Sequence, residues 1–134
     1  MNLLMDTHII LWAVTDDDRL SKKARDMILD PDNTVYYSAV SVWEILLKHD
    51  SPACNIDCTA SEFVQDCREA GYYPLNLTEK HILTVDTLKR NEGGKEHKDP
   101  FDRLLIAQAK AENFSFLTHD KLIAGYNEKC IISV

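Results

Sequence analysis

The sequence predicts an α/β domain with a mainly parallel sheet of about five strands. Short runs rich in β-forming residues alternate with helical stretches, which is the pattern of consecutive strand–helix–strand units. The length of 134 residues fits one domain, spanning residues 1–134. Apolar residues make up 45% and charged residues 28% of the chain, which is typical of a globular protein and not of a disordered one.

Apolar runs and helix caps define the elements of the first half. The run NLLM opens the chain as a strand, and Ser21 is a favourable N-cap for a later helix. Ser41 and Thr59 are each followed three residues later by glutamate, which matches the capping box. In chain order we predict a strand at 2–5, helices at 9–14 and 21–29, a strand at 34–38, and helices at 41–48 and 59–70.

The second half shows the same alternation. Thr78 is a favourable N-cap, and Asp99 before Pro100 is typical of an N-cap with proline at the first helical position. The polar loop KRNEGGKEHKD precedes the helix that begins at Pro100. In chain order we predict a strand at 73–75, helices at 78–89 and 100–112, a strand at 115–117, a short helix at 121–125 and a strand at 130–132.

Charge and cysteine content exclude several classes of protein. The net charge of -7 is opposite to that of an ordinary nucleic-acid binder, unless part of the acidity forms a cation site. Four cysteines at irregular spacing do not form a disulfide framework or a zinc motif. No apolar run reaches the roughly 20 residues that span a bilayer, and no secretory signal is recognisable, so we expect a cytoplasmic protein without a membrane partner.

Acidic residues follow the predicted strands. Asp6 comes directly after the first strand, Glu44 lies early in the helix after the second, and Asp120 closes SFLTHD after the fourth. Asp99 and Asp102 open the helix that leads into that fourth strand. Because an open parallel sheet binds ligands beyond the carboxyl ends of its strands, these side chains are expected to converge.

Each of these residues also has a local explanation. Carboxylates are favoured at helix starts, and Glu44 in particular could complete a capping box with Ser41. Helix capping, however, does not require the capped ends to meet at one sheet edge. Carboxylates in one crevice raise one another's pKa or require a cation, and oxygen ligands suit Mg²⁺ or Mn²⁺.

Four stretches carry a family resemblance: LLMDTHIILW, SAVSVWEILLK, HKDPFDRLLIAQA and FLTHD, which together run from residue 3 to residue 120. In this order they make the chain resemble the PIN-domain family, and within it the VapC-type toxin ribonucleases of type II toxin–antitoxin systems. The resemblance implies a three-layer α/β/α sandwich and an endoribonuclease that depends on Mg²⁺ or Mn²⁺, in which the metal activates water.

The resemblance also implies roles for the acidic residues. The implied catalytic set is Asp6, Glu44, Asp102 and Asp120, and the implied metal ligands are Asp6, Asp99, Asp102 and Asp120. Whether Asp99 or Asp102 binds directly stays open, although Asp102 is favoured because Asp99 is occupied as a helix cap. Thr7 and Thr118 are candidate supporting hydroxyls, whereas His8, His97 and His119 are not expected to be catalytic.

The implied partners are RNA and a protein antitoxin. Phosphates would meet cationic residues near the proposed site, which otherwise form a solvated loop and helix face: Lys48, Lys89, Arg90, Lys95, Lys98 and Arg103. The antitoxin's basic C-terminal segment would place an arginine among the carboxylates, and the toxin would form a homodimer. Trp12 and Trp43 are predicted to lie in the core, since both stand beside apolar residues.

Two other hypotheses remain. The chain could be a non-catalytic PIN-like protein-binding module whose acidic residues only cap helices. It could also be an aspartyl-phosphate enzyme or receiver domain, although the lysine-bearing late-strand motif of that class is missing. The sequence leaves open which RNA would be cleaved.

Overall fold

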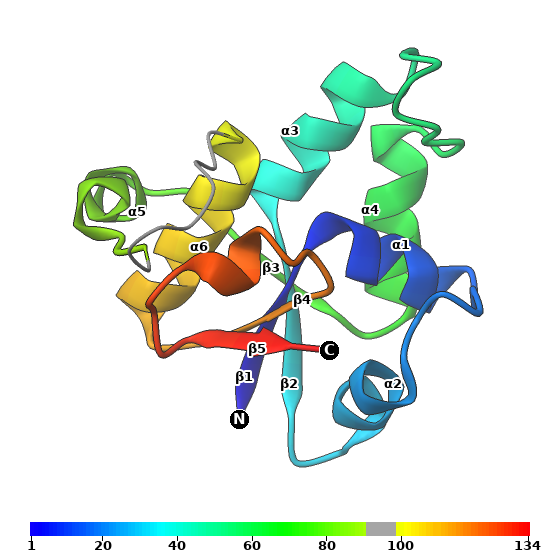
Figure 1. The fold of residues 1–134 in the computed structure, drawn as a ribbon. Coiled ribbons are helices and arrows are strands. Elements are labelled where there is room, and N and C mark those ends of the chain that lie inside the picture. The colour runs from blue at the N-terminus through cyan, green and yellow to red at the C-terminus, as the bar shows by residue number, and fades with distance from the viewer. Residues whose placement is uncertain (91–98) are drawn as a thin grey trace.

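Five parallel strands form one sheet in the order β3-β2-β1-β4-β5 (Figure 1). The computed structural model describes residues 1–90 and 99–134. The expected mainly parallel sheet of about five strands is confirmed. The strands are β1 (Asn2–Met5), β2 (Thr34–Ser38), β3 (Tyr73–Leu75), β4 (Ser115–Thr118) and β5 (Ile131–Ser133).

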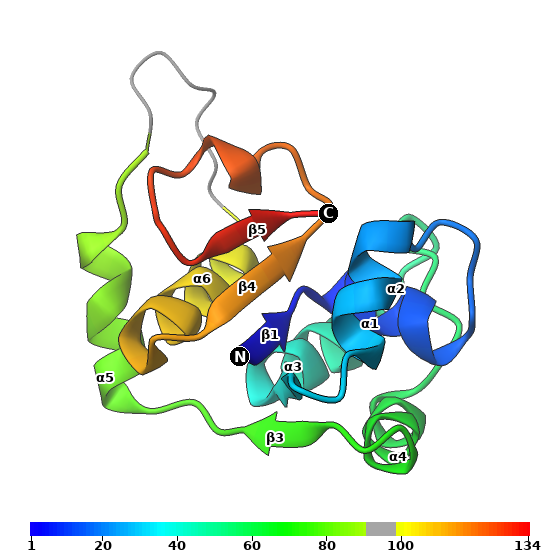
Figure 2. The same ribbon diagram turned by 90° about the horizontal axis from the view of Figure 1, so that it is seen from below.

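Helices cover both faces of this sheet. Figure 2 shows α1 and α2 on one side and α5 and α6 on the other. The helices are α1 (Thr7–Val14), α2 (Lys22–Leu29), α3 (Ala39–Lys48), α4 (Ala60–Glu69), α5 (Glu79–Thr84) and α6 (Pro100–Glu112), with 3-10 turns η1 (Val85–Thr87) and η2 (Ile123–Gly125). No helix in residues 1–90 or 99–134 is long and apolar enough to cross a bilayer.

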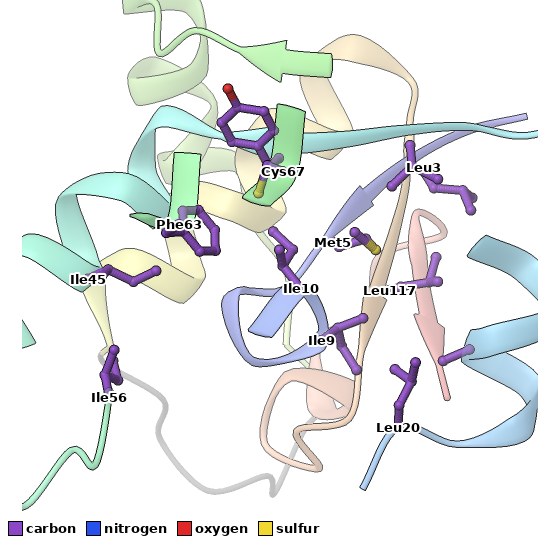
Figure 3. Close-up of a cluster of buried hydrophobic side chains, with 13 residues drawn as sticks. Leu3, Met5, Ile9, Ile10, Leu20, Ile45, Ile56, Phe63, Cys67 and Leu117 are labelled. Atoms are coloured by element: carbon purple, nitrogen blue, oxygen red, sulfur yellow. The ribbon is translucent and has the colours of Figure 1, made fainter. Parts of the chain in front are cut away.

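The strand residues alternate between two hydrophobic cores. On β1, Leu3 and Met5 join the cluster beneath α1, α2 and α4 (Figure 3), whereas Leu4 joins the cluster beneath α6. All three side chains are fully buried. A parallel strand buried on both faces requires a helical layer on each side, so the α/β/α sandwich is confirmed.

Helix α3 begins two residues earlier than predicted and has a different N-cap. The helix begins at Ala39, and Ser38 caps it by accepting a hydrogen bond from the Val40 N–H at 2.9 Å. Ser41 is therefore a buried residue within the helix, and the predicted capping box of Ser41 with Glu44 is wrong. The predicted box of Thr59 with Glu62 is confirmed.

The other helix predictions are right in place: the helix predicted at 100–112 has the predicted bounds, and the others differ in length. The first helix begins at Thr7, two residues earlier than predicted. The helix predicted at 78–89 is the shorter α5 followed by η1, and the last short helix is the single turn η2. In α5 the buried His81 completes a capping box by accepting from the Thr78 N–H, so its Nε2 donates to Glu112 Oε1 at 2.7 Å.

Strand β3 ends the sheet on one side. It pairs with β2 alone among the described strands, and its central residue is Pro74, opposite Tyr37. Proline has no N–H to donate to a ladder, and it is confined to edge strands for that reason. Tyr73 beside it is 58% exposed.

Candidate active site

A cleft of about 270 Å³ opens at the carboxyl edge of the sheet. The chain enters α1, α3 and α6 at this edge (Figure 1). All five acidic residues that the sequence singled out line the cleft. The lining consists of Asp6, His8, Ile9, Trp12, Glu44, Lys48, Asp99, Asp102, His119 and Asp120.

Asp6 lies at the centre of the sheet edge, directly after β1. Its carboxylate makes no side-chain cap of α1, so the helix-cap explanation does not hold for this residue. Instead Thr118 Oγ1 donates a hydrogen bond to Asp6 Oδ2 at 2.8 Å. Burial raises the pKa of Asp6 to about 6, and the charges of Glu44 and Asp120 add to the rise.

Glu44 projects from α3 and is 4% exposed. Thr7 Oγ1 donates to Glu44 Oε1 at 2.7 Å, and Lys48 Nζ lies 2.6 Å from Oε2. Thr7 Oγ1 also lies 2.8 Å from Ser41 Oγ, which explains why a serine is buried at that point of α3. Both carboxylate oxygens are thus held in place, which offsets the cost of burying the charge.

Asp99 and Asp102 start α6 and have different surroundings. Asp99 caps the helix, because its Oδ1 accepts from the N–H groups of Phe101 and Asp102 at 2.9 and 3.1 Å. The predicted cap is therefore confirmed. The pKa of Asp102 is raised to about 8 by burial and then by the charges of the other four carboxylates, beginning with Asp6.

Asp120 follows β4 and is tied to Asp6 through one hydroxyl. Its backbone N–H donates to Thr118 Oγ1 at 3.1 Å, while that hydroxyl donates to Asp6. The Asp120 side chain caps the next turn, accepting from the Leu122 N–H at 2.8 Å. Thr7 and Thr118, the two expected hydroxyls, therefore contact Glu44 and Asp6 respectively.

The donor set of the cleft suits a divalent cation. Five carboxylates line it, and burial together with their mutual repulsion favours the neutral form of Asp102. A bound cation would offset the unfavourable energy of the ionised carboxylates. Within residues 1–90 and 99–134, no three His, Cys, Asp or Glu side chains already stand at the spacing of a metal site. Lys48 is the cation among the described residues that line the cleft.

The other predicted cationic partners are more scattered than expected. Lys89 lines a separate hollow of about 550 Å³ together with Lys110. Arg90 lies over the ring of Tyr126, 4.6 Å from its centroid. Lys95 and Lys98, like His97, lie outside the described residues, and Arg103 is absent from the lining of the cleft.

The aromatic side of the cleft was missed by sequence reasoning. Trp12 packs partly against the core, as predicted, but it also lines the cleft with His8 and His119. The available signal was the spacing of His8 and Trp12, which places them one turn apart on the helix that begins after Asp6. The core prediction for Trp43 is wrong, because this side chain is 54% exposed on α3.

Comparison with known proteins identifies the family. The family model of the PIN domain matches residues 3–129. The fold is similar to a chain in the crystal structure of VapBC2 from Rickettsia felis bound to a DNA fragment from their promoter, with a TM-score of 0.64 and 15% sequence identity over 100% of this chain and 98% of that chain. No curated protein matches the sequence. A family match over nearly the whole length, on a sheet and cleft of this kind, shows that the chain belongs to the PIN domain family.

Proposed function

We propose that this chain is a divalent-metal-dependent endoribonuclease that acts in the cytoplasm as the toxin of a toxin–antitoxin pair. The observation that carries the proposal is the convergence of five carboxylates, distant in sequence, on one cleft at the carboxyl edge of the sheet. Membership of the PIN family and the fold shared with the VapBC2 chain support it. We regard residues 1–134 as one catalytic domain.

The carboxylates fit a hard divalent cation such as Mg²⁺ or Mn²⁺. In this proposal Asp6 and Asp102 are the main ligands, Asp99 is a neighbouring carboxylate, and Glu44 and Asp120 act through water or position the nucleophile. A bound ion of this kind supplies Lewis acidity and an activated water for attack on a phosphodiester.

The remaining residues orient the carboxylates. Thr118 fixes Asp6 and the backbone of Asp120, and Thr7 fixes Glu44. Asp99 caps α6 and accepts a hydrogen bond from the Asp102 N–H, and it thereby fixes the backbone of Asp102 in the first turn of the helix. Lys48 holds Glu44 and offers the cleft a positive charge that a phosphate group can approach.

The decisive experiment measures RNA cleavage by purified Asp6→Asn and Asp102→Asn chains. Both variants should lose Mg²⁺-dependent cleavage and the ability to arrest growth, while the melting temperature shows that they remain folded. Asp57→Asn is the matched control, since Asp57 is an exposed aspartate away from the cleft. Cleavage that persists in either cleft variant, or that continues in EDTA, would refute the proposal.

The proposed protein partner is an antitoxin with a basic C-terminal segment. The acidic cleft offers carboxylates for bidentate pairing with arginine. Apolar side chains on α3 give such a partner further surface, since Trp43, Leu46 and Leu47 are each more than half exposed. Co-expression with a small DNA-binding protein encoded next to this chain should yield a stable complex, and gel filtration of the chain alone should show a homodimer.

One observation favours the alternative of a non-catalytic protein-binding module. In the described parts of the chain the carboxylates are not yet at metal-site spacing, and Glu44 is already neutralised by Lys48. This alternative requires that Mn²⁺ leaves the melting temperature unchanged, whereas the nuclease requires a rise. A thermal scan with and without Mn²⁺ separates the two.

A further inference from the structure

Three aromatic rings form one wall of the acidic cleft. His8 and Trp12 come from α1, and their ring centroids are 6.1 Å apart at an interplanar angle of 55°. His119, which follows β4, meets Trp12 at 5.5 Å and 73° in an edge-on contact. All three line the cleft that holds the carboxylates, so this aromatic wall stands directly beside the proposed reaction centre.

Core packing explains only part of this arrangement. Trp12 is half-buried and packs against the core cluster, whereas His8 and His119 are exposed, and His119 Nδ1 lies 3.0 Å from the Val134 carbonyl oxygen. Two water-accessible imidazoles flank the indole where it lines the cleft.

A positive charge also lies against Trp12, on Arg19, which itself does not line the cleft. The Arg19 guanidinium carbon lies 5.3 Å from the centroid of the Trp12 ring, which is within cation–π range. Asp17 fixes that guanidinium through contacts of 3.1 and 2.8 Å, while the arginine side chain remains 65% exposed. Flat aromatic surface combined with a cation is the combination with which proteins bind single-stranded nucleic acid.

We propose that Trp12, His8 and His119 form a subsite that stacks one unpaired nucleobase of an RNA strand whose phosphate lies at the carboxylates. The subsite rests on the proposed nuclease function and requires that the stacked nucleotide be unpaired, because a base must leave its helix to stack on a side chain. Every base has a π-face, so the subsite positions the strand and does not read its sequence.

The two tryptophans of the chain allow a direct test. Trp43 lies outside the cleft, so Trp43→Phe leaves Trp12 as the single tryptophan, and Trp12→Phe leaves Trp43 as a matched control. Both variants also carry Asp102→Asn, so that the proposed nuclease activity does not degrade the RNA during the titration. Each chain is titrated in Mg²⁺ with a short single-stranded RNA oligonucleotide of mixed sequence and with an abasic oligonucleotide of the same length.

The subsite requires that RNA quenches Trp12 fluorescence to saturation and leaves Trp43 fluorescence unchanged. The abasic oligonucleotide should quench neither. Loss of one stacked base corresponds to about a fivefold or larger fall in affinity, which we expect for Trp12→Leu and, as a second variant at an exposed site, for His8→Ala. Trp12→Phe should keep more affinity than Trp12→Leu, since it keeps a ring.

The outcomes separate this subsite from the nuclease proposal. One outcome is that Asp102→Asn abolishes cleavage while RNA fails to quench Trp12 fluorescence and binds the Trp12→Leu and His8→Ala variants as tightly as the parent. In that case the nuclease proposal stands and the subsite is refuted. Equal quenching by the abasic oligonucleotide would also refute it. Quenching by an arginine-rich peptide but not by RNA would assign the aromatic wall to a protein partner instead.

Discussion

Replacing Asp102 by asparagine should flatten the pH dependence of stability in the metal-free chain. The pKa of this carboxyl is raised from 3.8 to about 8 in the folded protein by burial and by the neighbouring carboxylates. The folded state therefore binds its proton more tightly than the unfolded state does. Between about pH 4 and about pH 8 the folded state holds more protons, so stability falls as the pH rises.

The size of the effect follows from one proton per molecule. One proton corresponds to about 1.4 kcal/mol per pH unit, and hence to at most about 3 kcal/mol between pH 5 and pH 7. Solvent screening of the half-buried side chain makes this an upper limit. For a chain of this length it corresponds to a difference of at most about 10 °C in melting temperature.

Differential scanning calorimetry in EDTA at several pH values measures this difference. The parent chain and the Asp57→Asn control should lose stability with parallel slopes as the pH rises from 5 to 7, and Asp102→Asn should lose less. Parallel slopes for all three chains would show that the Asp102 proton is not linked to folding. The reasoning about charge repulsion in the cleft would then be wrong.

Further substitutions test other parts of the structure. Mg²⁺ or Mn²⁺ at pH 8 should raise the melting temperature, with about 2.7 kcal/mol of stabilisation at a hundredfold excess over the dissociation constant, and Asp6→Asn should lose this shift in a thermal scan. Thr118→Val removes the hydroxyl shared by Asp6 and Asp120 and should cost about 1–3 kcal/mol in urea denaturation, whereas Thr118→Ser should cost less. His81→Leu leaves the Thr78 N–H without its buried acceptor and should cost a similar amount, about 1–3 kcal/mol, with RNA cleavage retained. Trp43→Ser should change urea stability by about 0.5 kcal/mol or less, because the side chain is mostly exposed, while weakening antitoxin binding measured by calorimetry.

The sheet and the acidic cleft could be predicted because their signals are local. Strands and helix caps can be recognised from a few consecutive residues. Because ligands bind beyond the carboxyl ends of parallel strands, the order of these elements then predicts that Asp6, Asp102 and Asp120 lie close together. The cap formed by Asp99 could be recognised from the following proline alone.

The failures occurred where a distant contact decides what a residue does. Ser41 and Glu44 have the spacing of a capping box, but their partner is Thr7, more than thirty residues earlier in the chain. Trp43 stands among apolar neighbours in sequence, yet the exposed face of α3 carries it into solvent. Sequence periodicity does not distinguish a helix face that contacts the core from one that is left for a partner.

Pro74 disfavours one mode of association, the addition of a strand at the β3 edge of the sheet. Unpaired backbone N–H and C=O groups on an edge strand can pair with a strand of a neighbouring molecule, and repeated pairing of this kind leads to aggregation. The ring at the middle of β3 removes a donor from that row, so β-augmentation at this edge is discouraged. A partner that covers the exposed Tyr73 on this strand is therefore expected to do so with a helix or a loop and not by extending the sheet.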